Sequence, residues 1–292
     1  MPSLPRRETS CPDPDGPIRL LALDIDGTLI GEDLVLRDRT IRAVGEAVRR
    51  GVFVSIVTGR MTSSALGYAH RLGLTEPIIG YQGAISREIR PHDDPRLGRL
   101  LRHHPLDART AADIVAWTRA AGLTPHFNHL EKVILPDDDP RADDYSRFVG
   151  GRLTLVPDLD RWLVTRRWVT KVIAVGPEPG PVDAFPAARE AFQGRAEVTI
   201  SHPRFLEFVA PGVSKGEALA WLARRRRIPL EETMAIGDQF NDLDMIAMAG
   251  HGVAMANAPA EVRAVARHIA PSIQEEGAAT IIEELVLGRP GR

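Results

Sequence analysis

The chain has 292 residues, and its 37 Lys and Arg residues against 39 Asp and Glu residues give a formal net charge of -2. This balance excludes a global electrostatic attraction to nucleic acid or to an anionic membrane surface. No apolar stretch approaches the roughly 18 residues of a membrane span, and the length suggests about two domains.

The N-terminal segment is rich in proline and charge and lacks the apolar core of a signal peptide. We expect residues 1–17 to form a disordered tail. The single cysteine, Cys11, falls in this tail, so it has no disulfide partner within the chain. These features predict a cytoplasmic protein without structural disulfides.

The first informative segment is an apolar run that ends in two acids, LALDIDGTL at residues 21–29. Such a run before a glycine turn predicts a buried parallel strand. Asp24 and Asp26 would lie at its carboxyl end, where open α/β sheets bind ligands. Neighbouring carboxylates repel each other unless a cation lies between them, and hard oxygen ligands suit Mg2+. The alternative is a surface turn, because Asp and Gly are common turn residues.

The second segment, VSIVTGR at residues 54–60, is another apolar run that ends in polar residues. The Thr58 hydroxyl and the Gly59 amide could donate to a phosphate oxygen near a helix start. A plain strand–turn–helix junction would have the same pattern. The periodicity around this segment is typical of the start of a doubly wound α/β fold, with strands near 52–57 and 77–81 and helices over 38–50 and 61–72.

The pattern changes in the middle of the chain. Residues 86–105 carry charges, prolines and three histidines, and we expect an irregular hairpin and linker there. A second α/β module is predicted to follow, with helices over 107–121, near 141–149 and near 181–192, and strands over 123–128, 131–135, 168–175, 196–200 and 205–209.

Polar residues flank a predicted hairpin turn in this module. His126, Asn128 and His129 are candidates to reach a substrate, although packing within the module is their default role. The histidines have neither helical His-x-x-x-His spacing nor matching cysteines, so we expect no zinc site.

The third segment is a predicted helix start that carries one of the three lysines of the chain. Ser214, followed three residues later by Glu217, forms a capping-box pattern, so a helix is predicted to begin at Lys215. The Lys215 ammonium would then lie beside the positive end of that helix, a suitable place to hold an anion. Lysines at helix starts are common, but this sequence otherwise uses arginine, which favours a function for the compact charge.

The fourth segment, TMAIGDQFNDLDMIAMA at residues 233–249, has the most specific pattern. Asp238 follows a predicted strand, as the first acid of the DIDGT segment does. Asn241 is expected to cap a helix with Asp242 and Asp244 in its first turn, and Asp244 is expected only to complement the helix dipole. Carboxylates from two strand ends predict an oxygen-lined site that suits Mg2+.

In this order and at these separations, the segments DIDGT, TGR, SKG and GDQFND resemble the motifs of the haloacid dehalogenase-like (HAD) superfamily of phosphatases. The chain most resembles the Cof-type subfamily, in which a large α/β cap is inserted between the second and third motifs. The resemblance covers residues 19–287. One departure is YQGA at residues 81–84, where the family more often has Asn; the Gln82 amide is expected to preserve the turn.

The resemblance implies a doubly wound parallel-sheet (Rossmann-like) core with an inserted α/β cap domain. Residues 18–85 and 211–292 would form the discontinuous core, and residues 86–210 the cap. The cap would close over the site, exclude bulk water and select the leaving group.

The resemblance also implies a role for each motif residue. Asp24 would be the nucleophile that forms an aspartyl-phosphate, and Asp26 the general acid and then the base that activates water. Arg60 has no assigned role, because a salt bridge within the fold is equally expected. The phosphoryl oxygens would be bound by Thr58, Gly59, Lys215 and Asn241. Mg2+ would be held by Asp24, Asp26 (with its backbone carbonyl), Asp238 and Asp242, the last directly or through water.

These features predict a Mg2+-dependent phosphatase that hydrolyses a small phosphorylated metabolite, such as a sugar phosphate or a phosphorylated cofactor. Two alternatives stay open: a phosphotransferase or phosphomutase on the same scaffold, and a non-catalytic metabolite-binding module. A P-loop or dinucleotide-binding protein ranks last, because neither glycine-rich fingerprint is present. The substrate and the oligomeric state cannot be read from the sequence.

Overall fold

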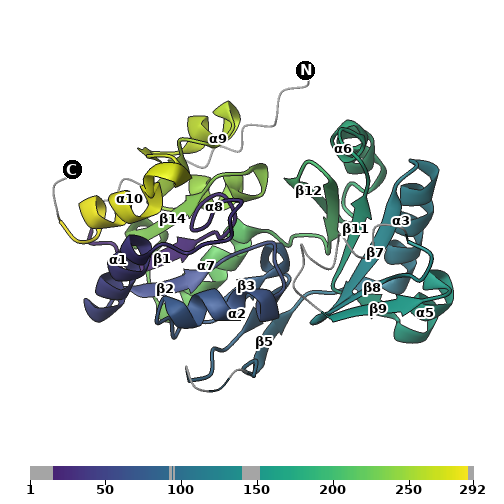
Figure 1. Ribbon diagram of the computed structural model, residues 1–292, viewed down its shortest axis with the longest axis horizontal. Coiled ribbons are helices and arrows are strands. Elements are labelled where there is room, and N and C mark those ends of the chain that lie inside the picture. The colour runs from purple at the N-terminus through teal and green to yellow at the C-terminus, as the bar shows by residue number, and fades with distance from the viewer. Residues whose placement is uncertain (1–15, 92–93, 95, 140–151, 289–292) are drawn as a thin grey trace.

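The computed structural model describes residues 16–91, 94, 96–139 and 152–288, which form a core and a second α/β module (Figure 1). The helix expected near 141–149 and nearly all of the expected tail lie outside the described residues. Among the described helices, none combines the length and apolar character that crossing a membrane requires.

The core is built on a five-stranded sheet in which every neighbouring pair is parallel. In sheet order, its strands are β16 (His268–Ala270), β15 (His251–Met255), β14 (Thr233–Gly237), β1 (Leu20–Leu23) and β2 (Phe53–Ile56). The first and fourth sequence segments therefore supply adjacent strands at the centre of the sheet. All residues of β1 and β14 are buried, which explains their continuous apolar runs.

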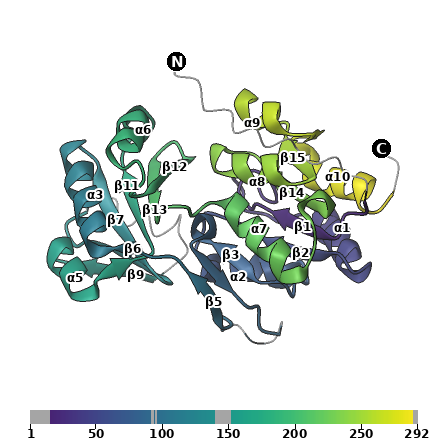
Figure 2. The same ribbon diagram turned by 180° about the vertical axis from the view of Figure 1, so that it is seen from behind.

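Helices cover both faces of this sheet (Figures 1 and 2). Leu21 and Leu23 of β1 belong to a core cluster that includes residues of α1, α2 and α10, whereas Leu20 and Ala22 pack with α7, α8 and α9. This alternation is what a doubly wound sheet requires. The helices are α1 (Asp38–Arg49), α2 (Thr62–Arg71), α7 (Lys215–Arg226), α8 (Leu243–Met248), α9 (Ala260–Val265) and α10 (Gly277–Leu285).

A small antiparallel sheet connects the core to the second module. Its strands are β3 (Ile78–Gly80), β4 (Ile85–Arg87) and β5 (Leu100–His103), and a parallel bridge between Val57 and Ile79 joins it to the core. The irregular hairpin expected over 86–105 agrees with this arrangement, because β4 and β5 pair antiparallel and their register shifts between Ser86 and Arg87.

The second module contains a six-stranded mixed sheet with its helices on the side away from the core (Figure 1). In sheet order, the strands are β12 (Glu197–His202), β13 (Phe205–Val209), β11 (Lys171–Val175), β7 (Thr124–His129), β8 (Lys132–Pro136) and β9 (Arg152–Val156). The helices are α3 (Ala108–Ala120), α5 (Leu159–Arg166) and α6 (Gly180–Ala191), and β6 (Leu106–Asp107) pairs with β10 (Trp168–Val169).

Aromatic packing covers the helical side of this sheet. The Phe127 ring of β7 stacks on Trp162 of α5 at 5.8 Å between centroids, and Trp117 of α3 meets Phe208 of β13 edge-on at 5.9 Å. The opposite face carries Lys171 and Glu207 and is turned toward the core, where these two residues contact Gly59 and Gln82. We call this inserted module the cap.

The predicted α/β fold, with a parallel core sheet and a separate inserted mixed sheet, is confirmed. The strand β9 and the helix α5 were not predicted from the sequence. The α5 helix is short and buries only Leu159 and Leu163, so its apolar periodicity is weak. The domain boundaries after residues 85 and 210 stay predictions.

Candidate active site

Asp24 and Asp238 lie side by side because they follow two adjacent parallel strands. The backbone N–H of Asp24 donates to the carbonyl of Ile236 on β14 at 3.0 Å, and both carboxylates are almost fully buried. The turn after β1 passes directly over Asp238. Gly27 has a φ of +77°, and a Cβ there would lie 2.1 Å from Asp238 Oδ2, so only glycine fits.

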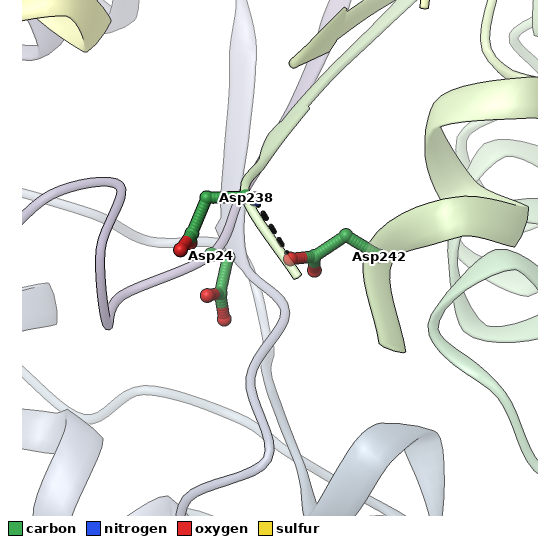
Figure 3. Close-up of side chains that lie close together, drawn as sticks. All are labelled: Asp24, Asp238 and Asp242. Carbon is green, nitrogen blue, oxygen red and sulfur yellow. Dashed lines mark hydrogen bonds between the residues drawn. The ribbon is translucent and has the colours of Figure 1, made fainter. Parts of the chain in front are cut away.

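Asp242 completes a cluster of three buried acids (Figure 3). Its Oδ2 accepts hydrogen bonds from the backbone N–H groups of Asp238 and Gln239, each at 2.9 Å. One carboxylate oxygen from each of Asp24, Asp238 and Asp242 lies within 4.8 Å of the others. The acids come from the ends of two strands and from a single-turn helix that follows β14.

The Lys215 ammonium is fully buried between two of these acids. Its Nζ donates to Asp24 Oδ1 at 2.7 Å and to Asp242 Oδ1 at 2.5 Å. The helix α7 begins at Lys215, as predicted, and the Ser214 hydroxyl accepts from the N–H of Glu217 at 3.1 Å. The predicted helix start thus places the ammonium inside the acid cluster.

The electrostatics of the cluster favour an additional cation. Burial, the largest effect, together with repulsion by Asp242 and Asp26, raises the pKa of Asp24 to about 7 against the attraction of Lys215. Burial also raises the pKa of Asp238 well above its usual value, helped by repulsion from the other two acids. Burial by itself would lower the pKa of Lys215, but the attraction of Asp24 and Asp242 outweighs this effect and raises the pKa. Three carboxylates with one ammonium leave an excess of negative charge that a divalent ion would neutralise.

Asp26 does not bring its carboxylate into the cluster. Its side chain is 51% exposed and pairs with Arg60, whose Nε donates to Asp26 Oδ2 at 2.6 Å and whose Nη2 donates to Oδ1. The expectation that its carboxylate helps to hold the metal thus lacks support in this structure, because the chain leaves the strand after Asp24 and turns this side chain outward. Arg60 has the salt bridge that was considered for it.

Thr58, Gly59 and Asn241 lie on loops beside the cluster. Thr58 follows β2 and is buried, and its Oγ1 accepts from the Arg60 N–H at 3.2 Å. Asn241 does not cap a helix, contrary to expectation: Gln239 is the N-cap of the single-turn helix Phe240–Asp242, and the Asn241 amide donates to Gln82 Oε1 at 3.0 Å.

Asp244 was expected only to complement the dipole of its own helix. It does lie in the first turn of α8, but it is half-buried and hydrogen-bonded to the Ser214 side chain and the Gly216 backbone at the start of α7. Burial raises its pKa. Asp244 therefore helps to position the helix that carries Lys215.

Several residues near the site were not anticipated. Thr28 Oγ1 donates to Asp238 Oδ1 at 3.0 Å. From the cap, Lys171 Nζ donates to the Gly59 carbonyl at 3.2 Å and pairs with Glu207 at 2.9 Å. Lysine is rare in this chain, and the same rarity that made Lys215 a candidate site residue could have made Lys171 one as well.

The polar residues of the cap hairpin are mostly enclosed within the cap. His126 is buried and paired with Asp139, while the His129 ring stacks on Trp168 at 4.0 Å between centroids. Asn128 is also buried, next to Lys171 on the neighbouring strand. That any of these three contacts a substrate stays a prediction.

The model of a family described as haloacid dehalogenase-like hydrolase matches residues 21–282. The chain belongs to this family. The predicted superfamily and the enzyme class, a phosphatase, are thereby confirmed.

The similarity to individual members extends over whole chains. The 5-amino-6-(5-phospho-D-ribitylamino)uracil phosphatase YitU of Bacillus subtilis is 29% identical over 91% of this chain and 96% of its own length. The HMP-PP phosphatase of Serratia proteamaculans is 29% identical over 85% of this chain and 87% of its own. A haloacid dehalogenase-like hydrolase from Bacteroides thetaiotaomicron has a crystal structure that superposes with a TM-score of 0.76 at 25% identity, covering 91% of this chain and 98% of that one.

Proposed function

We propose that this HAD phosphatase hydrolyses a small phosphorylated metabolite in a Mg2+-dependent reaction that passes through an aspartyl-phosphate on Asp24. The observation that carries the proposal is the buried cluster in which Lys215 bridges Asp24 and Asp242 beside Asp238. Membership of the family supports the reaction class, and the buried cluster supports Asp24 as the nucleophile with Lys215 and a metal ion beside it.

The acid cluster fits Mg2+ in charge and in ligand type. Its donors are hard carboxylate oxygens, and the excess negative charge is of the size that a divalent ion compensates. Asp24, Asp238 and Asp242 would hold the ion, with the Asp26 backbone carbonyl as the further ligand that the family resemblance implies. When bound, Mg2+ supplies positive charge that offsets the repulsion between the nucleophile and the phosphate and stabilises the transition state.

Asp24 would attack phosphorus. Lys215 holds its Oδ1 at 2.7 Å and stabilises the ionised form, which leaves Oδ2 to form the bond to phosphorus. As that bond forms, the bond between phosphorus and the leaving oxygen breaks, and the electron pair goes to the leaving alcohol. The covalent step divides one difficult hydrolysis into two easier steps.

Asp26 acts as the acid and then the base. Its exposed position allows it to meet an incoming leaving group, to which it would donate a proton. In the second step the same carboxylate would accept a proton from water as the water oxygen bonds to phosphorus. The bond between phosphorus and Asp24 Oδ2 breaks at the same time, which returns its electron pair to the Asp24 carboxylate and releases phosphate. The transferring phosphoryl oxygens would be bound by Thr58, Gly59, Lys215 and Asn241.

The substrate class follows from the relatives and from the cap. Two full-length relatives are named as phosphatases of phosphorylated small molecules, a ribitylaminouracil phosphate and HMP-PP. Here the polar face of the cap is turned toward the loops of the site, with Lys171 in contact with Gly59. We therefore assign a small phosphorylated metabolite, either a sugar phosphate or a phosphorylated cofactor, as the substrate.

The test is phosphate release with Mg2+ across a panel of sugar phosphates, nucleotides and phosphorylated cofactors, with p-nitrophenyl phosphate as a generic substrate. Asp24→Asn is the negative control, and Asp113→Asn, an exposed acid-to-amide change on the cap, is the matched control. Turnover that requires Mg2+ and disappears only in Asp24→Asn supports the proposal. Transfer of phosphate to an added sugar without phosphate release would instead indicate a phosphotransferase.

A further inference from the structure

A buried polar connection runs from the cap to the loops beside the acid cluster. On the cap, Lys171 and Glu207 lie on neighbouring strands, β11 and β13, and form an ion pair of 2.9 Å. The Ser201 hydroxyl donates to the same carboxylate at 2.7 Å. Both charged residues are almost fully enclosed, at 3% and 4% exposure.

The core side of this connection is made by Gln82 in the YQGA turn. Its Nε2 donates to Glu207 Oε2 at 2.9 Å, and its Oε1 accepts from Asn241 Nδ2 at 3.0 Å. Lys171 also donates to the carbonyl of Gly59 at 3.2 Å. Two residues proposed to bind the phosphoryl group, Gly59 and Asn241, are therefore tied to the same cap ion pair.

Local geometry shows that the length of the Gln82 side chain matters. Gln82 has a φ of +60°, a conformation in which Asn is much more common than Gln. A Cβ on Gly59 would lie only 2.5 Å from Gln82 Nε2, so the amide is pressed against the loop. Gln82 thus has an unfavourable backbone conformation, and its long side chain spans the gap between Glu207 and Asn241.

Stability alone is a weak reason for such an arrangement. Desolvation of two buried charges commonly offsets their mutual attraction, so a buried ion pair can be replaced by apolar residues with little loss of stability. The ion pair does fix the relative positions of Lys171 and Glu207, because separating the two side chains would leave a buried charge without a partner.

We propose that Gln82 and the Lys171–Glu207 ion pair are positioning residues that align Gly59 and Asn241 for phosphoryl transfer only while the cap is docked on the core. The inference rests on the proposed function of the site. Docking of the cap would complete the hydrogen bonds that orient the Asn241 amide and the Gly59 loop. Catalysis would then be coupled to closure without any contact between these cap residues and the reacting atoms.

The decisive variant is Gln82→Asn, assayed with p-nitrophenyl phosphate and Mg2+. Asn suits the backbone conformation, so the fold should be kept, but its side chain is one methylene too short to join Glu207 to Asn241. We expect kcat to fall by a factor on the order of 10–100. Mg2+ affinity, measured by calorimetry, should stay unchanged because no member of the acid cluster is altered.

A second variant approaches the connection from the cap. Glu207→Gln should lower kcat as Gln82→Asn does, and the double variant should lose much less than the product of the two factors, because both changes break one connection. Asp113→Asn, an acid-to-amide change elsewhere on the cap, should match the wild type. If Glu207→Gln does not fold, Gln82→Asn still decides the question.

The outcomes separate this inference from the proposed function. A wild-type enzyme with no turnover across the whole panel overturns the phosphatase proposal and the inference that rests on it. An active wild type with Gln82→Asn at the same kcat and KM overturns only the positioning role. A loss of kcat with unchanged Mg2+ affinity supports it, whereas an equal loss of Mg2+ affinity would show that Gln82 acts through the acid cluster and would overturn it.

Discussion

Lys215 and Asp24 are separated by 191 positions in the sequence, yet the Lys215 Nζ lies 2.7 Å from Asp24 Oδ1 in the buried centre of the site. The ammonium is held at this place by the start of α7, and the carboxylate by the end of β1. Their contact joins the two halves of the core that the cap sequence separates.

Replacement of Lys215 by methionine should destabilise the protein strongly. Asp24 and Asp242 would be left as neighbouring buried acids without a compensating cation, and removal of one partner of a buried ion pair typically costs about 3–5 kcal/mol. Urea unfolding at pH 8 without Mg2+ would measure the loss, with Lys132→Met as the matched control on an exposed lysine. Equal unfolding midpoints for the two variants would contradict the assigned role of Lys215.

Asp24→Asn should separate activity from stability. We expect turnover to be lost because the amide cannot act as the nucleophile. Without Mg2+ at pH 8, the unfolding midpoint should not fall below that of the wild type, because the change removes a carboxylate whose charged form is disfavoured by burial. Phosphate release and thermal unfolding would be measured on the same preparation. Substantial residual turnover would rule out Asp24 as the nucleophile.

The metal-free protein should become less stable as the pH rises toward neutrality. The pKa of Asp24 is raised to about 7 in the folded state from an ordinary value of 3.8. Between these two values the folded chain binds a proton that the unfolded chain releases, so this stabilising contribution is complete below the lower value and is lost as the pH rises through the upper one. The raised pKa of Asp238 acts in the same direction.

Binding of Mg2+ should counteract the loss of stability that the metal-free protein shows as the pH rises. The ion competes with protons for the same carboxylates, so the stabilisation by Mg2+ should be small near pH 5 and larger at pH 8. Thermal unfolding across this pH range, with Mg2+ or with EDTA, would measure both effects. A melting temperature that responds equally to Mg2+ at both pH values would contradict a metal site built on Asp24 and Asp238.

Asp26→Ala should reduce turnover in a way that depends on the leaving group. A general acid matters most when the leaving alcohol is strongly basic, so the loss should be large for an alkyl phosphate and much smaller for p-nitrophenyl phosphate. Steady-state kinetics on both substrates would give the ratio, with Arg60→Met showing what loss of the ion pair alone does. An equal loss on both substrates would remove Asp26 from the role of proton donor.

The strand-end acids could be predicted because their signal is local and the geometry that follows is general. An apolar run before Asp24 and another before Asp238 predict two buried parallel strands, whose carboxyl ends meet at one edge of the sheet. The same reasoning placed Lys215, since Ser214 and Glu217 define the start of its helix. The four ordered motifs were sufficient to predict the family and the fold.

The orientation of Asp26 and the connection through Gln82 could not be derived in this way. Asp26 is two residues from Asp24, but the turn directs it toward Arg60 on a different loop. The Gln82–Glu207 contact joins positions 125 apart and forms only where the cap meets the core. No local pattern encodes either partner.

The strands that carry Asp24 and Asp238 and the helix start at Lys215 could be predicted from the sequence, because hydrophobic periodicity and capping act over a few neighbouring residues. Which polar groups meet across the boundary between cap and core is settled only when the chain folds. Those contacts depend on how the cap sheet is docked on the core, and packing over the whole interface sets this docking. Because burial removes water from the charged groups, each buried charge must then pair with a group within its reach.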